Sequence, residues 1–272
     1  MIRMKDLRIA LVVMTSPVGE TGGNLDRMAR WVARAVKGGA KLVCFPEMNI
    51  TGYSSREEIQ KVAEPIPGDA SRRVSSLATR EGITILAGMA ERETGNLFFA
   101  SHLVATPDGA VQVYRKTHIA PPEKQVFSSG QIASLFEISD VRFGIQLCYD
   151  AHFPGLSTRM AVKGADVIFL PHASPRGTPE GKLQSWMRHL SARAFDNGLF
   201  VAAVNQTGDN GLGLSFPGMA VVIGPDGEVL CQDVSGNEGI LFADLKSDVL
   251  AHVRRHPMRY FLPNRRPEIY AD

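Results

Sequence analysis

The segment Val141-Arg142-Phe143-Gly144-Ile145-Gln146-Leu147-Cys148-Tyr149-Asp150 places a thiol directly after a short apolar run. The run predicts a buried strand, and a helix is expected to follow over residues 157–163. A strand that carries a thiol to a sharp turn before a helix is how α/β proteins present a nucleophile. The turn exposes the sulfur, and the backbone N–H groups beyond it can hold a developing oxyanion. This segment therefore predicts an α/β fold with Cys148 as a candidate nucleophile.

Strands and helices alternate along the rest of the chain. Apolar runs predict strands over residues 9–14, 41–45, 83–90, 98–105, 110–114, 144–147, 167–170, 199–204, 218–224, 228–231 and 240–244. Apolar residues that repeat at three and four positions predict the other helices over residues 24–35, 71–81, 183–195 and 247–254.

Two Pro-Asp-Gly turns, at 107–109 and 225–227, each join two expected strands and lie about half a chain apart. This repetition indicates two similar halves. No stretch rich in proline, glycine or serine separates the halves as a linker would. We therefore expect one domain over residues 1–272, with two mixed sheets that face each other and helices outside.

The composition is that of a soluble globular protein, with 44% hydrophobic and 21% charged residues. The formal net charge is +2, and the lysines and arginines are scattered, which argues against nucleic-acid binding. The three cysteines, Cys44, Cys148 and Cys231, form no Cys-x-x-Cys pair, so neither a disulfide framework nor a thiolate zinc site is expected. Reduced thiols predict a cytoplasmic protein.

Membrane insertion and secretion are not expected. The first eight residues have no long apolar region and no small-residue cleavage site, so they do not read as a signal peptide. No apolar run approaches the roughly 20 residues of a membrane-spanning helix.

The last residues, 255–272, are expected to form an arm. Residues 254–272 hold five arginines, three prolines and three aromatic residues, Tyr260, Phe261 and Tyr270. The prolines exclude a continuous helix. Arginine beside aromatic residues is typical of subunit contacts, so we expect a homodimer or a larger homo-oligomer.

Two further charged residues lie at strand ends and could act with Cys148. Glu47 follows the strand expected at 41–45, on the edge where α/β sheets tend to bind ligands, and could accept the thiol proton if burial raised its pKa. Lys116 follows the strand expected at 110–114 and could stabilise an oxyanion. Each residue alone has a commoner role, as a core thiol, a loop carboxylate or a surface cation. Their shared placement at strand ends favours a catalytic unit.

The histidines allow other interpretations. Cys148 and His152 lie four residues apart, so a papain-like Cys-His pair is conceivable. A two-histidine metal site has no ligand spacing to support it, and no metal is expected. His152 and His172 are expected to line the pocket or to make a hydrogen bond in the core. Arg176 is either a solvated loop residue or a group that reaches a substrate carboxylate.

Segments spread over nearly the whole chain resemble the nitrilase, or carbon–nitrogen hydrolase, superfamily. They are Asn24-Leu25 with Gly39-Ala40-Lys41-Leu42-Val43-Cys44-Phe45-Pro46-Glu47, then Thr51-Gly52-Tyr53, Tyr114-Arg115-Lys116-Thr117-His118, Glu123-Lys124 with Phe127 and Gly130, Gly144-Ile145-Gln146-Leu147-Cys148-Tyr149-Asp150 with Phe153-Pro154, and Ala192-Arg193-Ala194 with Asn197, Asn205 and Gly208. Each is weak by itself, but together and in this order they are specific.

The resemblance implies an α-β-β-α four-layer sandwich with no metal and no organic cofactor. It implies that Cys148 is the nucleophile, that Glu47 is the general base, and that Lys116 holds the oxyanion with the backbone N–H of Tyr149. Glu123 matches a second glutamate that orients the lysine. Further residues are expected to line the oxyanion or substrate site: Tyr53, His118, His152, His172 and Arg176.

Departures from the superfamily's pattern narrow the expected activity. Tyr149-Asp150 stands where nitrilases proper carry Trp-Glu, and is commoner in amidases and carbamoylases. Ala151-His152 stands where members that bind a carboxylate place arginine, which argues against that kind of acidic substrate. We therefore expect a thiol hydrolase of a small amide or N-carbamoyl compound. Nitrile hydrolysis by the same residues, and a catalytically silent binding module of the same fold, are the alternatives.

Overall fold

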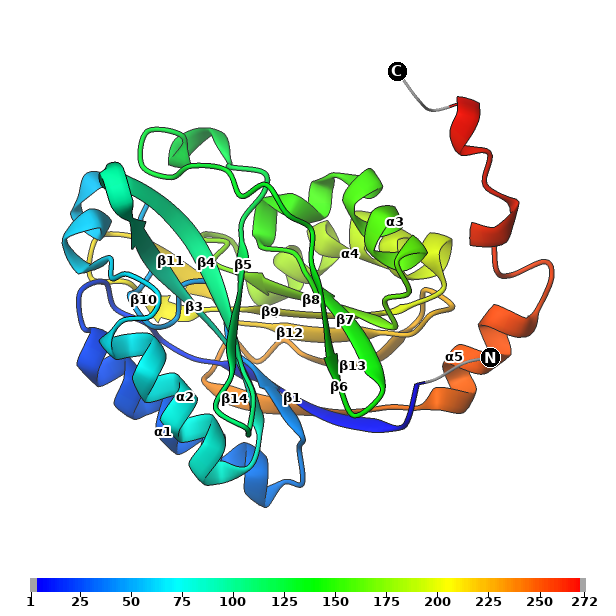
Figure 1. Ribbon diagram of the computed structural model, residues 1–272, viewed down its shortest axis with the longest axis horizontal. Helices are drawn as coiled ribbons and strands as arrows, with labels where there is room; N and C mark the ends of the chain where they lie inside the picture. Colours follow the sequence, from blue (N-terminus) through cyan, green and yellow to red (C-terminus); the bar gives the residue numbers. More distant parts are fainter. Residues whose placement is uncertain (1–3, 270–272) are drawn as a thin grey trace.

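The computed structural model describes residues 4–269, apart from the side chain of Asn96. Two six-stranded sheets lie face to face, with helices α1 and α2 covering one and helices α3 and α4 covering the other (Figure 1). The architecture is thus the expected α-β-β-α sandwich of two mixed sheets.

The first sheet has the order β14-β1-β2-β3-β4-β5. Its strands are β1 (Leu7–Val13), β2 (Leu42–Cys44), β3 (Thr84–Glu93), β4 (Leu97–Ala105), β5 (Val111–Arg115) and β14 (Gly239–Leu245). Strands β1, β2 and β3 are parallel. Antiparallel pairs add β14 beside β1, β4 beside β3, and β5 beside β4.

The second sheet, β13-β12-β9-β8-β7-β6, repeats this arrangement. Its strands are β6 (Leu135–Ile138), β7 (Val141–Ile145), β8 (Val167–His172), β9 (Phe200–Asn205), β12 (Ala220–Ile223) and β13 (Val229–Asp233). Strands β7, β8 and β9 are parallel, and the β12-β13 hairpin follows them as β4-β5 follows β3. The two Pro-Asp-Gly turns therefore occupy equivalent places in the two sheets.

The described residues form five α-helices, which pack outside the sheets or beside them. They are α1 (Thr21–Lys37), α2 (Asp69–Glu81), α3 (Pro154–Val162), α4 (Pro179–Asn197) and α5 (Ser247–Arg255). Helix α2 ends at Gly82, whose φ of 63° is the left-handed conformation that glycine adopts without strain. Helices α1, α3 and α4 begin three or four residues earlier than expected. For α3 and α4 the reason is that Pro154 and Pro179 fit the first helical turn.

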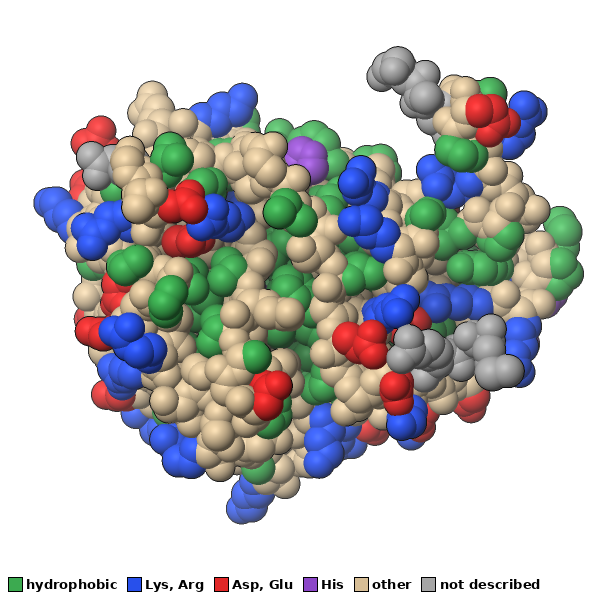
Figure 2. Space-filling model, in the orientation of Figure 1, with side chains coloured by type: hydrophobic (Ala, Val, Ile, Leu, Met, Phe, Trp, Pro, Cys, Tyr) green, Lys and Arg blue, Asp and Glu red, His purple; other side chains and the backbone are tan. Residues whose placement is uncertain are grey.

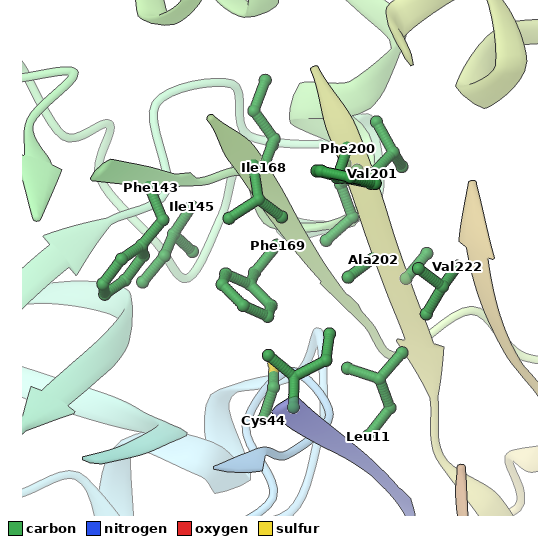
Figure 3. Packing of buried hydrophobic residues seen from close by; sticks show 14 of the residues in the cluster. Leu11, Cys44, Phe143, Ile145, Ile168, Phe169, Phe200, Val201, Ala202 and Val222 are labelled. Carbon is green, nitrogen blue, oxygen red and sulfur yellow. The ribbon is translucent and has the colours of Figure 1, made fainter. Parts of the chain in front are cut away.

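Alternation along the strands builds the core. In β1, Leu11 points between the sheets, whereas its neighbour Val12 faces α1 and α2. Figure 3 shows Leu11 and Cys44 of the first sheet opposite Phe169 of the second. Cys44 is fully buried among these apolar side chains, so it is a core thiol.

Three short strands were not expected from the sequence: β6, β10 (Thr207–Asp209) and β11 (Ser215–Pro217). Strand β6 lies at a sheet edge, and β10 and β11 pair only with each other. Such short segments lack the long apolar alternation that marks a strand in a sequence.

In residues 4–269 no helix is long and apolar enough to cross a bilayer.

The arm begins at residue 256, because α5 extends through Arg255. As far as residue 269, it contains only short 3-10 turns, and it projects from the body (Figure 1). Tyr260 lies over Gly198, and the Phe261 ring lies 5.5 Å from the Phe195 ring of α4. Figure 2 shows hydrophobic side chains gathered where the arm meets the body. Tyr270, which we expected to belong to this arm, lies outside the described residues.

Candidate active site

Three strands deliver the expected catalytic groups. Glu47 lies three residues beyond β2, Lys116 directly follows β5, and Cys148 lies three residues beyond β7. Two of these strands belong to the first sheet and one to the second. The site is therefore assembled by the packing of the two sheets.

Lys116 is held between two carboxylates in the interior. Its Nζ donates to Glu47 Oε1 at 2.8 Å and to Glu123 at 2.9 Å. Burial alone would lower the pKa of Lys116, but the two carboxylates outweigh it and raise that pKa above its usual value. The side chain is completely buried, so this site holds a fixed positive charge away from water.

Glu123 is fixed by three donors. Besides Lys116, the Tyr53 hydroxyl donates to its Oε1 at 2.8 Å and the Ala120 N–H donates to its Oε2 at 3.0 Å. The structure thus brings Tyr53 and Glu123 into the lysine cluster, where Tyr53 contacts Glu123 rather than presenting its hydroxyl to an open pocket.

Glu47 is held by contacts from the second sheet. The Ala173 N–H donates to its Oε2 at 3.1 Å, and Gln206 Nε2 donates to its backbone oxygen at 2.7 Å. Burial raises the pKa of the Glu47 carboxyl to about 7, although the Lys116 ammonium opposes the shift. A carboxyl group that titrates near neutral pH is suited to both accepting and donating a proton.

Cys148 occupies a strained turn. Its φ is 43°, a left-handed conformation that is uncommon for a residue other than glycine and is often found at functional sites. Burial raises the pKa of the thiol, and the Glu47 charge raises it further, while Lys116 and the Ala173 N–H lower it. The sulfur is therefore a thiol at rest and needs a nearby base to become a nucleophile.

Asp150 joins the cysteine turn to the lysine segment, a role that the sequence did not reveal. Its Oδ1 accepts hydrogen bonds from the Thr117 hydroxyl and from the backbone N–H of His118, each at 2.8 Å. Its Oδ2 accepts from the Tyr114 hydroxyl at 2.8 Å and from the Leu147 N–H at 3.0 Å. Burial would raise the pKa of Asp150, but its hydrogen bonds outweigh burial and lower it, so the group is a buried carboxylate.

His118 and Tyr149 lie together at the surface. The His118 ring stacks on Phe153 with 3.8 Å between centroids, and its Nδ1 lies 2.8 Å from Asp150 Oδ1. His118, Tyr149 and Phe153 line a hollow of about 550 Å³, and Lys124 borders it. The hollow therefore lies beside the turn that follows Cys148 and is lined partly by aromatic rings.

His172 lies in the core, whereas His152 lies at the surface. His172 is buried and stacks on Trp186 at 3.9 Å, and burial lowers its pKa to about 3, so it is a neutral core histidine beside the site. His152 is exposed and packs against His189 at 4.5 Å and Tyr149 at 5.6 Å. Within residues 4–269 no hydrogen bond joins His152 to the Cys148 sulfur, so the geometry does not support a papain-like pair.

Arg176 lies on an exposed loop, with its backbone N–H bonded to the Ser215 oxygen at 2.9 Å, and it does not join the buried cluster. In the described part of the chain, no three His, Cys, Asp or Glu side chains are arranged to hold a metal ion. The residues that come together are Glu47, Lys116, Glu123, Tyr53 and Cys148.

Known proteins resemble this chain over most of its length. Residues 8–255 match the model of the carbon-nitrogen hydrolase family. A nitrilase of Pyrococcus abyssi is 29% identical over 97% of this chain and 99% of its own length. An (R)-stereoselective amidase of a Pseudomonas species is 31% identical over 82% of this chain and 80% of its own.

Solved structures agree with these sequence relationships. XC1258 of Xanthomonas campestris, a CN-hydrolase superfamily protein, superposes with a TM-score of 0.86 at 29% identity, covering 97% of this chain and 98% of its own. An amidase from Nesterenkonia, of the nitrilase superfamily, superposes with a TM-score of 0.84 at 28% identity, covering 97% of this chain and 95% of its own. A mutant of that amidase carries the acetamide moiety of fluoroacetamide on its active-site cysteine.

Proposed function

This chain belongs to the carbon–nitrogen hydrolase family, and from that premise we propose that it hydrolyses the C–N bond of a small amide or N-carbamoyl compound through a thioester on Cys148. The observation that carries the proposal is the buried contact of Lys116 with Glu47 and Glu123, at 2.8 and 2.9 Å, beside a thiol on a strained turn. A cation and a base fixed next to a thiol are the parts that acyl transfer needs.

The first half of the reaction forms the acyl-enzyme. Glu47 takes the proton of the Cys148 thiol, and the thiolate attacks the carbonyl carbon. Lys116 and the backbone N–H of Tyr149 then stabilise the oxyanion of the tetrahedral intermediate. Glu47 returns the proton to the leaving nitrogen, the C–N bond breaks, and ammonia or an amine departs.

The second half releases the acid. Glu47 takes a proton from a water molecule, the hydroxide attacks the thioester, and the same two donors stabilise the second oxyanion. The C–S bond breaks, and Glu47 returns its proton to the sulfur. Glu123 acts as a positioning residue, because its contact fixes the Lys116 ammonium where the oxyanion forms.

Nitrile hydrolysis is the second candidate, supported by the similarity to the Pyrococcus abyssi nitrilase. It uses the same nucleophile, with a thioimidate in place of the first tetrahedral intermediate. A panel of simple amides, N-carbamoyl amines and nitriles at equal concentration distinguishes the two, with ammonia release as the readout.

We expect turnover of amides or N-carbamoyl compounds to exceed that of nitriles. Fluoroacetamide should also attach one acetamide moiety to the Cys148 sulfur, with loss of fluoride, as seen by mass spectrometry, and Cys148→Ala should show neither reaction. Folded protein that releases no ammonia from any of the three classes, and that fluoroacetamide leaves unmodified, would contradict the proposal.

A further inference from the structure

Lys182, on the first turn of α4, is a half-buried cation that neutral groups hold in place. Its Nζ donates to the Ser174 hydroxyl at 2.9 Å and to the Pro175 carbonyl at 3.0 Å. Among residues 4–269 no carboxylate lies within ion-pair distance of it. An ammonium has three N–H donors, and these two contacts use two of them. Both acceptors are neutral, so no anion balances the positive charge.

The loop that holds Lys182 is fixed to the catalytic base. The Ala173 N–H donates to Glu47 Oε2 at 3.1 Å. The next residue, Ser174, exchanges two backbone hydrogen bonds with the Asn205 amide, at 2.8 and 3.0 Å. Lys182 is therefore bonded to a rigid loop, one residue away from the backbone group that contacts the base.

Lys182 is linked to the catalytic base through Ser174 and the adjacent Ala173 N–H, and it would respond electrostatically to a thiolate on Cys148. Burial lowers the pKa of the Lys182 ammonium, and negative charge on Cys148 opposes that shift. The two side chains thus lie within electrostatic reach of each other. A partly desolvated cation near a reaction centre is unfavourable unless an anion accompanies it, and a substrate can supply that anion.

We propose that Lys182 binds a carboxylate on the substrate, so that the substrates are small amides or N-carbamoyl compounds that carry a carboxylate at the end away from the scissile bond. This inference rests on the hydrolase function proposed above and names its substrate class. The sequence argued against an acidic substrate because Ala151-His152 replaces an arginine. The cation comes instead from a different segment, the loop after β8 and the start of α4.

Matched substrates of similar length test the proposal. Butyramide is neutral, whereas the monoamide of succinic acid carries a carboxylate at the far end. The wild-type enzyme should prefer the acid amide in kcat/KM. Lys182→Met should lower the ratio of acid amide to neutral amide at least about tenfold, mainly through KM, because it removes a charge-assisted contact. Lys182→Glu should lower it further.

Two lysines serve as comparisons. Lys41 is exposed at the amino end of β2, opposite the end that carries Glu47, so Lys41→Met should leave the ratio unchanged. Lys124 borders the hollow beside Tyr149 and is the rival binding group. If Lys124→Met lowers the ratio and Lys182→Met does not, the carboxylate binds at that hollow and the proposal is wrong.

A binding measurement separates this inference from the hydrolase function. Cys148→Ala protein should bind the acid amide in calorimetry, and the Cys148→Ala/Lys182→Met double variant should bind it at least about tenfold more weakly. Equal binding by the two proteins, or equal turnover of both substrates by the wild-type enzyme, overturns the inference while ammonia release still supports the hydrolase. No ammonia from any amide overturns both.

Discussion

Asp150 Oδ1 lies 2.8 Å from Nδ1 of His118, so the turn that carries the candidate nucleophile is bonded directly to the segment that carries the lysine. The two residues are 32 positions apart and follow strands of different sheets. Cys148 and Lys116 lie two residues from Asp150 and His118 respectively. This contact therefore ties the turn that carries the sulfur to the segment that carries the ammonium.

Asp150→Asn should loosen the link between the Cys148 turn and the Lys116 segment. The amide retains the shape but turns one acceptor into a donor, which leaves buried N–H or O–H groups unpaired at a cost of about 1–3 kcal/mol in unfolding free energy. We expect kcat to fall about tenfold or more and iodoacetamide to alkylate Cys148 more slowly. Tyr114→Phe, which removes one donor to the same carboxylate, should have a smaller effect. Wild-type kcat and alkylation rate in Asp150→Asn would rule out this positioning role.

Cys148→Ala should abolish turnover, because no other sulfur can form the thioester. Cys231→Ala is the matched control. That half-buried thiol donates to the Phe242 carbonyl, so the variant should retain most activity. Activity should also survive EDTA, as expected for a reaction that uses no metal. Near-wild-type turnover by purified Cys148→Ala, or full loss on chelation that zinc restores, would show that the thiol mechanism is wrong.

Glu47 should control the pH dependence. Its pKa is raised to about 7 by burial, and only the deprotonated form can accept the thiol proton. As the pH falls below about 7, kcat/KM should therefore fall about tenfold per unit, and above that value it should level off. Glu47→Gln should lower the rate by roughly two to four orders of magnitude and abolish this dependence. If kcat/KM of Glu47→Gln falls at low pH in the same way, a group other than Glu47 is responsible for the pH dependence.

Tyr53→Phe should test the orientation of Glu123. The Tyr53 hydroxyl donates to Glu123 Oε1 at 2.8 Å, next to the Lys116 contact on the same oxygen. Loss of one buried hydrogen bond, about 0.5–1.5 kcal/mol, should reduce kcat by about two- to tenfold with little change in KM. Tyr260→Phe, in the arm, provides the control and should retain wild-type kcat. An unchanged kcat in Tyr53→Phe would mean that Lys116 and the Ala120 N–H hold Glu123 without the Tyr53 hydroxyl.

Deletion of residues 257–272 should weaken the assembly. We expect a dimer or larger oligomer on light-scattering chromatography, because Met258 and Ile269 remain largely exposed while Phe261 only partly packs on Phe195. Removal of the arm should also lower the melting temperature, since it takes away the Tyr260 contact over Gly198. A monomeric wild-type protein at micromolar concentration, with an unaffected deletion variant, would show that the arm mediates no assembly.

Local sequence patterns predicted most of the fold. The strands of the two parallel cores were identified because each is a short apolar run, and the helices because their apolar residues repeat at helical spacing. The starts of α3 and α4 were placed late, since apolar periodicity does not mark a first turn that begins with proline. Strands β6, β10 and β11 were missed because their pairing, and not their composition, makes them strands.

The amino-acid pattern alone identified which residues stand at the ends of the strands, because strand, turn and residue type are local properties. Glu47, Lys116 and Cys148 could therefore be chosen before the structure was known. The surroundings of these residues depend on the packing of the two sheets. The Glu47 carboxylate meets an N–H that lies 126 positions away, and Asp150 gathers donors from a segment more than 30 positions earlier. Such contacts depend on how two buried sheets pack face to face, which no local pattern records.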